Sequence, residues 1–391
     1  MLDWEFIGKM FLNRLKLYNF RNYEACEVIF PSNKTLLVGK NAQGKTNLLE
    51  AVYYLATLSS FRAGNDKEMI GWGSDYCLIN ADVNKYGSDI ELKVVINPPK
   101  QKVLKVNGLK KNSFAQFLGN LLMVSFTVSD LLLLRGAPSD RRKWLDDAIS
   151  QIYPAYKDRL SKYAKIRTQR NNYLKELKGN FSPSSSQEDF LSVLDEQIAI
   201  TGSNIIHLRM KYLSEIQPKA SEKHKNISIS EEELKIIYSS TTNWNFDATS
   251  DVIAKPDDIY EKYLETFKEK RMEEIARGQT VIGPHRDDVV FNINDKNALN
   301  FASQGQQRTI ILALKLSELD LIEEVVEESP ILLLDDVLAE LDDDRQEYLL
   351  RSIKETTQTI ITTTSISAFS QEYLEDKKIY AINAGQVEDY D

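Results

Sequence analysis

The chain of 391 residues has only two cysteines, Cys26 and Cys77, and three histidines. Two cysteines cannot build a disulfide framework, and the histidines show no metal-ligand spacing, so we expect ordinary buried thiols and no metal cluster of this kind. Long apolar runs are also missing. No run approaches the roughly 18 apolar residues of a membrane span, and the N-terminus lacks the features of a secretory signal. We therefore expect a soluble, cytoplasmic protein.

An excess of positive charge is absent as well. The net charge is −9, which argues against a protein that coats nucleic acid indiscriminately. The average hides a division, because residues 135–178 carry twelve Lys/Arg against five Asp/Glu, whereas residues 318–347 carry thirteen Asp/Glu against one Arg. Either run could be a solvated helix face, but their separation favours a local basic surface. The length suffices for two or three domains.

A glycine-rich loop is the most informative motif. Residues 39–46 read GKNAQGKT, with a short apolar strand pattern before them and helical spacing over 47–58. This order of strand, loop and helix is typical of a phosphate-binding loop, in which Lys45 contacts phosphate and the Thr46 hydroxyl coordinates Mg²⁺. The predicted ATP-binding residues here are Gly39, Lys40, Asn41, Ala42, Gln43, Gly44, Lys45, Thr46 and Asn47.

A second motif lies almost 290 residues further on. Residues 331–334 are aliphatic and end in Asp335-Asp336, as in a buried strand that delivers carboxylates to nucleotide-bound magnesium. Asp335 is predicted to hold the metal, and Asp336 to act as the base or to orient the attacking water. The alternative is that the pair only caps the next segment.

A third motif, FASQGQQR at residues 301–308, precedes a helical run over 309–321. A polar turn at a helix N-terminus is an anion site, but this one cannot wrap the same γ-phosphate as the first loop. We therefore predict that Ser303, Gly305 and Gln306 reach the nucleotide of a second copy, giving an ATP-dependent homodimer. The alternative is a simple helix cap.

The central part of the chain reads as mainly helical. Apolar side chains recur from Tyr156 to Leu177, a breaker covers 179–186, and a heptad seam runs from Leu191 to Tyr212, which predicts a short antiparallel coiled-coil hairpin. We predict a discontinuous ATPase head over 10–130 and 278–391 and an inserted helical lobe over 131–277. Residues 1–9 would be an extension without structure.

These motifs, in this order, resemble the RecF family of bacterial repair ATPases, relatives of the SMC and ABC-type head domains. The resemblance covers nearly the whole chain. It rests on LKLYNFRNY at 15–23, the phosphate loop continuing to Ala51, SFR at 60–62, GAPSDRR at 136–142, QRN at 169–171, GPHRDD at 283–288, SQGQQR at 303–308 and LDDVLAELD at 334–342.

The resemblance implies an α/β fold, an ABC/SMC-type P-loop ATPase head with a β-rich subdomain and an inserted helical lobe. It implies an ATP- and Mg²⁺-dependent dimer that binds DNA at single-strand gaps and at junctions of single- and double-stranded DNA. It also implies recombinational repair and replication restart, with RecO and RecR as partners that help RecA to load. The ATPase would be slow and stimulated by DNA.

The resemblance also assigns residues. Lys45 and Asp336 would be catalytic, Thr46 and Asp335 would bind the metal, and Ser303 and Asp342 would lie at the dimer contact. Two departures bear on this transfer. Ala42 stands where many members have glycine, which requires a backbone that is not left-handed. No histidine occupies the switch position, so Thr363 or Thr364 should fill it and turnover should be slow.

DNA contacts are predicted from charge alone, because binding to phosphate needs arginine or lysine on the surface. The candidates are Arg62, Arg141, Arg142, Lys143, Arg167 and Arg170. Arg167 and Arg170 could instead form ion pairs inside the hairpin. Two other functions remain open at this point, a transporter ATPase subunit and a nuclease-linked ATPase. The basic hairpin argues against the first, and the short segment after Asp342 argues against the second.

Overall fold

The computed structural model describes residues 8–179, 184–228, 232–242, 244–250, 252–366, 369, 374–375 and 377–390. The chain divides into two compact units. Unit 1 takes residues 1–131, 150–154 and 311–391, and unit 2 takes residues 132–149 and 155–310. Most of the predicted extension, residues 1–7, lies outside the described residues. Gly8–Lys9 form strand β1, which pairs in parallel with β14 (Glu328–Ser329).

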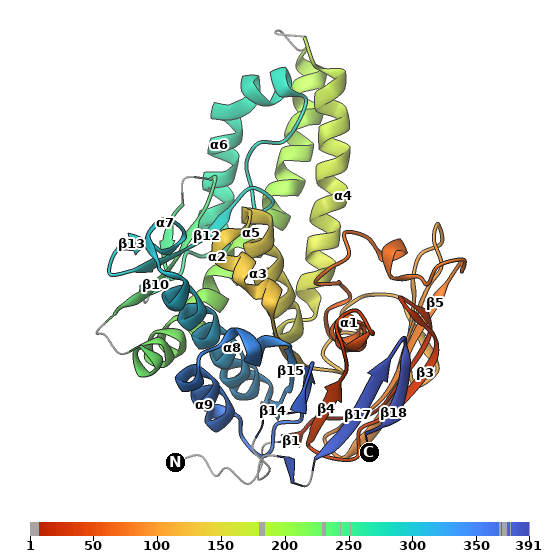
Figure 1. Ribbon diagram of the computed structural model, residues 1–391. Helices are drawn as coiled ribbons and strands as arrows, with labels where there is room; N and C mark the ends of the chain where they lie inside the picture. The colour runs from red at the N-terminus through yellow and green to blue at the C-terminus, as the bar shows by residue number, and fades with distance from the viewer. Residues whose placement is uncertain are drawn as a thin grey trace. The chain divides into compact units, whose positions relative to one another are not determined.

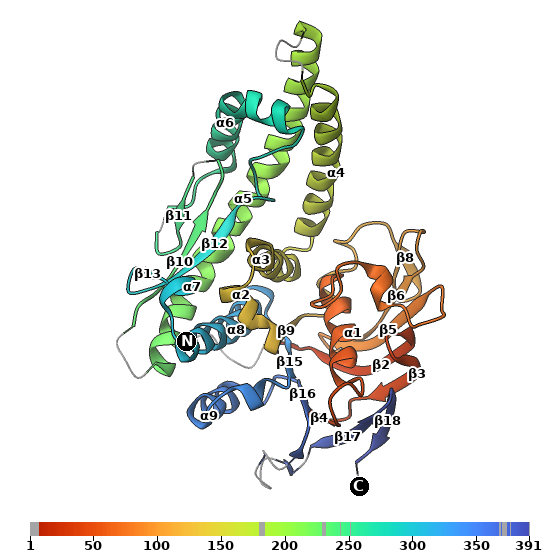
Figure 2. The ribbon, with the colours of Figure 1, turned by 45° about the horizontal axis from the view of Figure 1, so that its top comes forward.

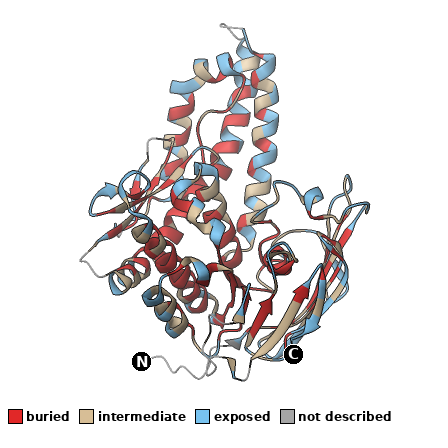
Figure 3. Cartoon of the chain, viewed as in Figure 1, coloured by how far each residue is buried: buried red, intermediate tan, exposed pale blue. Residues whose placement is uncertain are grey.

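The sheet that carries the phosphate loop has the strand order β18-β17-β4-β16-β15-β9. All its neighbouring strands are parallel except β18, which is antiparallel to β17. Strand β15 is buried along its whole length (Figure 3), as its aliphatic run predicts. The strands are β4 (Lys34–Val38), β9 (Met123–Thr127), β15 (Ile331–Asp335), β16 (Thr359–Thr363), β17 (Lys378–Asn383) and β18 (Gln386–Asp389).

Unit 1 also contains an antiparallel sheet of order β3-β2-β5-β6-β7-β8. This sheet is the β-rich subdomain that the family resemblance implies. The strands are β2 (Phe11–Phe20), β3 (Tyr23–Ile29), β5 (Cys77–Lys85), β6 (Ser88–Ile96), β7 (Val103–Val106) and β8 (Leu109–Lys111). The helices of this unit include α1 (Lys45–Thr57), α9 (Asp343–Ser352) and the 3-10 turns η2 (Asp66–Met69), η3 (Val128–Leu131) and η4 (Val337–Glu340).

In unit 2, α4 (Ala155–Glu176) and α5 (Ser185–Ile227) run side by side as the predicted antiparallel hairpin, and α6 (Pro256–Arg277) packs on α5 (Figures 1 and 2). The seam is apolar near the turn, where Leu174, Leu177, Leu191 and Ile275 form a buried cluster. The residues of the predicted heptad seam are buried, except Leu208, which is half-buried; the buried ones are Leu191, Leu194, Ile198, Thr201, Ile205 and Tyr212. Residues 180–183 of the predicted breaker lie outside the described residues.

The rest of unit 2 is a small sheet with short helices. Its strand order is β11-β10-β12-β13. The elements are α2 (Leu132–Arg135), α3 (Pro138–Ile152), β10 (Leu234–Ser239), β11 (Phe246–Asp247), β12 (Asp288–Ile293), β13 (Lys296–Asn297), α7 (Ala298–Phe301) and the start of α8 (Gln304–Val326). The last residues of α3, and α8 from Ile311 onward, belong to unit 1. Within the described part of the chain, no helix has the length and apolar character of a membrane span.

Candidate nucleotide-binding site

The glycine-rich loop connects the end of β4 to the start of α1. Gly44 has φ 120°, and a Cβ atom there would lie 2.7 Å from the hydroxyl oxygen of Tyr23, so the turn requires glycine. Lys45 is only 4% exposed, and its Nζ donates to the carbonyl oxygens of Gly39 (2.6 Å) and Lys40 (3.2 Å). The ammonium group is therefore held over the loop.

The two distant motifs meet at one edge of the parallel sheet. The Thr46 hydroxyl donates to Oδ1 of Asp335 over 2.9 Å, although the residues are 289 positions apart. Asp335 is buried, and burial is the main reason why its pKa is raised, while hydrogen bonds from Thr362 and Thr46 act in the opposite direction. The carboxylate is thus placed where its charge requires nearby donors or a cation.

Asp336 follows β15 with a left-handed backbone, φ 51°. This turn sends its side chain away from the strand, and its Oδ2 lies 3.7 Å from Nζ of Lys45. The two predicted catalytic side chains, Lys45 and Asp336, therefore lie next to each other at the phosphate loop. Asp336 remains partly exposed, as a residue that activates water must be.

The oxygen donors of Thr46 and Asp335 suit Mg²⁺, which prefers hydroxyl, carboxylate and water oxygens. Bound there with a nucleotide, Mg²⁺ would neutralise phosphate charge. The protein would supply the backbone N–H groups of the loop, the Lys45 cation and the helix N-terminus of α1. Within the described residues, no group of three or more His, Cys, Asp or Glu side chains forms a separate metal site.

Thr362, the residue before the two threonines predicted for the switch position, makes a direct contact with Asp335. Thr362 lies opposite Asp335 in the pairing of β15 with β16, and its hydroxyl donates to Asp335 Oδ1 over 2.8 Å. The same hydroxyl accepts from the backbone N–H of Asp336. Thr363 instead donates to the carbonyl of Ser365, and Thr364 is exposed. Thr362 is therefore the residue that orients the carboxylate.

We expect Thr362→Val to weaken Mg²⁺-dependent ATP binding by about 10–100-fold, the usual cost of removing a hydrogen bond that orients a metal ligand. Titration of ATP with and without Mg²⁺ measures the effect. Thr363→Val is the matched control, because its hydroxyl makes only a local turn contact. Equal losses in both variants would contradict the assignment.

The backbone of Ala42 also differs from expectation. Its φ is 65°, in the left-handed region that the substitution was predicted to avoid, so that prediction is wrong. Side chains other than glycine pay about 1–2 kcal/mol for this conformation. The loop therefore keeps a left-handed backbone at Ala42, and this conformation is strained for alanine.

Ala42→Gly should consequently raise the free energy of unfolding, by up to about 1 kcal/mol once the greater flexibility of glycine in the unfolded chain is subtracted. Urea unfolding of the full-length protein without nucleotide tests this expectation. A decrease in stability would mean that the methyl group makes a contact that outweighs the strain.

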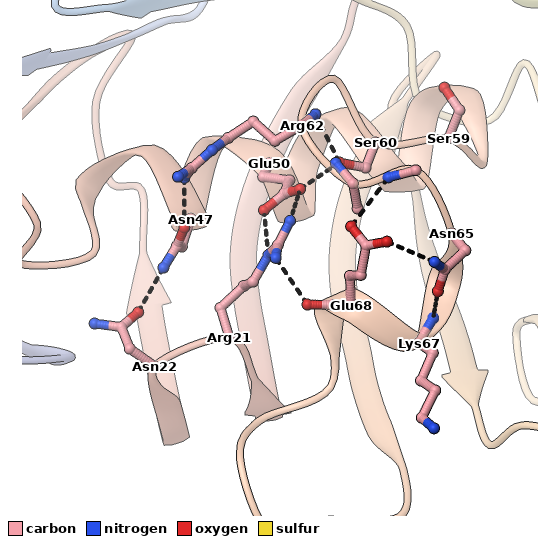
Figure 4. A network of polar contacts seen from close by, with 12 residues as sticks. Arg21, Asn22, Asn47, Glu50, Ser59, Ser60, Arg62, Asn65, Lys67 and Glu68 are labelled. Carbon is pink, nitrogen blue, oxygen red and sulfur yellow. Dashed lines mark hydrogen bonds and ion pairs between the residues drawn. The ribbon is translucent and has the colours of Figure 1, made fainter.

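Several loop supports had no predicted role, although they lie in motifs that carry the family resemblance. Glu50 is fully buried on α1 and accepts two hydrogen bonds from Arg21, at 2.6 and 2.8 Å, and one from Ser60 (Figure 4). Ser60 Oγ in turn accepts from the backbone N–H of Arg62. Asn47 contacts both Arg62 and Asn22. This network fixes the turn after α1 against the first turn of that helix.

The third motif forms the helix cap that was the alternative interpretation. The Ser303 hydroxyl accepts from the Gln306 N–H, and the Ser303 N–H donates to Gln306 Oε1, which is a capping box at the start of α8. Ser303 stays exposed, and Gly305 is half-buried. Asp342 caps α9 by accepting from the N–H of Arg345. Residues that cap a helix can still contact a second copy of the chain. The contact of Ser303, Gly305 and Asp342 with a second copy therefore stays a prediction.

Two of the predicted DNA contacts need correction. Arg170 is completely buried and pairs with Asp195 and Glu274, as the ion-pair alternative proposed. Arg141 is 6% exposed and grips Asp288 through two hydrogen bonds. Neither guanidinium is free to bind a phosphate, because Arg170 is held by two buried carboxylates and Arg141 is held by the half-buried Asp288.

The other four candidates stay at the surface to different degrees. Arg62 is exposed and donates to Asn47 beside the phosphate loop. Arg142 and Arg167 are half-buried, and Lys143, also half-buried, pairs with Asp147. The thiols differ too, since Cys77 is buried as expected whereas Cys26 is only half-buried.

Comparison with known proteins shows the family of this chain. The sequence model of the RecF/RecN/SMC N-terminal domain family matches residues 11–386. The DNA replication and repair protein RecF of Bacillus thuringiensis (strain Al Hakam) is 42% identical over 379 residues, which cover 97% of this chain and 98% of that protein. The RecF protein of Bacillus mycoides (strain KBAB4) gives the same values.

Solved structures extend the comparison. A structure of the recombination mediator protein RecF with ATP has a TM-score of 0.88 and 33% identity, with complete coverage of both chains. The Smc head domain derived from Pyrococcus furiosus has a TM-score of 0.50 at 15% identity over 97% of this chain and 95% of its own, which supports the head fold alone. The predicted α/β head with a helical lobe is thus confirmed, and the chain belongs to the RecF DNA replication and repair proteins of the RecF/RecN/SMC family.

Proposed function

We propose that this chain is an ATP-dependent DNA-binding protein of recombinational repair and replication restart. It binds DNA without sequence preference at single-strand gaps and at junctions of single- and double-stranded DNA. The observation that carries the proposal is the 2.9 Å hydrogen bond between Thr46 and Asp335, since it joins a phosphate loop to a metal-binding carboxylate. The family membership supports the DNA and repair part of the proposal.

Nucleotide binding is proposed to close a homodimer. Two copies would enclose two Mg²⁺-ATP molecules, with Ser303, Gly305 and Gln306 of each copy facing the nucleotide of the other. The exposed Ser303 hydroxyl at the start of α8 supports this role, because a helix N-terminus favours phosphate. Asp342 would lie at the same contact. RecO and RecR are the proposed partners, RecA is the indirect one, and the proposed location is the nucleoid in the cytoplasm.

Hydrolysis is proposed to be slow and to reset binding. Asp336 would take the proton of the attacking water, and Lys45 would balance the phosphate charge. Thr363 or Thr364 would occupy the position of the histidine switch, and a threonine hydroxyl is a poor base, so turnover should be slow. The enzyme is thus a DNA-stimulated ATPase used as a switch.

Analytical ultracentrifugation with ATP and a gapped oligonucleotide tests the switch. We expect a dimer for the native protein, a persistent dimer for Asp336→Asn with turnover reduced by about 10²–10⁴-fold, and a monomer for Lys45→Arg. Asp75→Asn, an exposed carboxylate in unit 1, is the control and should match the native protein. Monomers under every condition would refute the proposal.

A further inference from the structure

The segment from Gly283 to Asp288 in unit 2 turns almost all of its polar groups inward. The carbonyl of Pro284 accepts from the buried Arg209 over 2.7 Å. The carboxylate of Asp287 is fully buried and accepts from the hydroxyl groups of Tyr238 and Thr241. Internal partners therefore satisfy these groups.

His285 is fixed just as firmly. Its Nδ1 lies 2.7 Å from the hydroxyl of Tyr163, and its Nε2 lies 3.3 Å from the carbonyl of Thr280, so Nε2 carries the proton and Nδ1 accepts. Gly283 makes this packing possible, because a Cβ atom there would lie 1.8 Å from the hydroxyl of Tyr263. The segment is a rigid platform.

Arg286 is the exception in this platform. Its side chain is exposed, and within the described residues it has no side-chain hydrogen bond or ion pair. The acids that follow it cannot neutralise it, since Asp287 is buried and Asp288 is held by Arg141. The platform presents one uncompensated guanidinium to solvent.

Two further arginines lie around the same segment. Arg142 donates through Nη1 to the backbone carbonyl of Asp287, the residue that follows Arg286, over 2.7 Å. Arg167 stands one helical turn after Tyr163 on α4, the residue that contacts His285, and has no ion pair in the described parts of the chain. All three guanidinium groups belong to unit 2.

The positive charges of these three arginines all act on the imidazole ring of His285. The pKa of His285 falls to about 3, mainly because burial disfavours its charged form, and further because Arg167, Arg286 and Arg142 repel a proton. A neutral histidine adds no charge to the cluster. Three arginines of like charge therefore lie together with no described carboxylate to balance Arg167 or Arg286, an arrangement that an anionic ligand would stabilise.

We propose that Arg142, Arg167 and Arg286 form a phosphate-binding site for the backbone of duplex DNA, with Arg286 as its central contact. This inference rests on the proposed function and names the surface that performs it. Arginine at all three positions suits phosphate, because its planar donors match two phosphate oxygens at once. The rigid platform lowers the entropy cost of placing Arg286.

The test uses the full-length protein, a fluorescent duplex oligonucleotide, ATP and a series of salt concentrations. Loss of one phosphate contact should lower the slope of log affinity against log salt by about 0.9, which corresponds to about an eightfold loss at 0.1 M salt. We expect this for Arg286→Ala and for Arg167→Ala, and about twice the slope change for the double variant. Arg277→Ala, an exposed arginine paired with Glu273, is the control.

Each outcome decides the matter. A reduced slope, with unchanged ATP affinity and thermal stability, supports the site, and Arg286→Lys should then retain most of the native slope. Native affinity in the variants would overturn it while leaving the proposed function intact. Weaker binding with an unchanged slope, or a loss of dimerisation instead of DNA binding, would overturn it as well. If the native protein fails to bind DNA, the proposed function falls together with the site.

Discussion

Replacing Arg170 with alanine should destabilise unit 2 by about 3–5 kcal/mol, because it leaves the buried Glu274 without a cation and leaves Asp195 with Arg271 alone. Arg170 donates to Asp195 Oδ1 over 2.8 Å and also pairs with Glu274. The Cζ atom of its guanidinium also lies 4.2 Å from the centroid of the Phe267 ring. Burial already raises the pKa values of Asp195 and Glu274 despite the arginine, so its removal would favour protonation or water entry.

Urea unfolding followed by the fluorescence of Trp144 measures this effect, since that indole is buried in unit 2 against Tyr212 and Phe291. Arg167→Ala, less than one helical turn away on α4, is the matched control and should change stability by less than about 0.5 kcal/mol. A similar small change for Arg170→Ala would show that the ion pairs contribute little. Replacing Arg170 and Glu274 together with apolar residues, which leaves the pair of Asp195 with Arg271 in place, should recover part of the loss.

Acid should destabilise the protein through His285, and His285→Gln should remove that part of the pH dependence. The folded pKa of about 3 lies below the ordinary value of 6.5, so the unfolded chain binds a proton that the folded chain refuses. The contribution is fully present above pH 6.5 and is lost as pH falls toward 3. The slope of one bound proton is about 1.4 kcal/mol per pH unit.

Unfolding free energies between pH 7 and pH 4.5 provide the measurement. The difference between the native protein and the variant should shrink by up to about 2.7 kcal/mol between pH 6.5 and pH 4.5. Carboxylates that titrate in this range affect both proteins alike. His207→Gln, at a half-buried histidine whose Nδ1 lies 2.8 Å from the carbonyl of Ala254, serves as the control substitution. Parallel curves for the native protein and His285→Gln would contradict the assignment.

The nucleotide site shows which features were predictable from the sequence. The loop at Gly39–Thr46 and the Asp335-Asp336 pair were predictable because each motif contains both its chemistry and the strand or helix that positions it. Their meeting could be inferred, since the carboxyl ends of parallel strands lie at one edge of the sheet. Glu50 was missed because a single acid in a helical pattern gives no sign that it will be buried.

The class of chemistry was predictable without the fold, because phosphate binding and metal binding depend on short runs of neighbouring residues. Which of the three adjacent threonines contacts Asp335 depends on the fold, because the register of β16 against β15 places Thr362 opposite Asp335. The fold also buries the side chains of Arg170 and Arg141 and leaves that of Arg286 exposed to solvent. Burial depends on contacts between segments far apart in the chain, and identical arginine side chains in neighbouring positions carry no local signal of it.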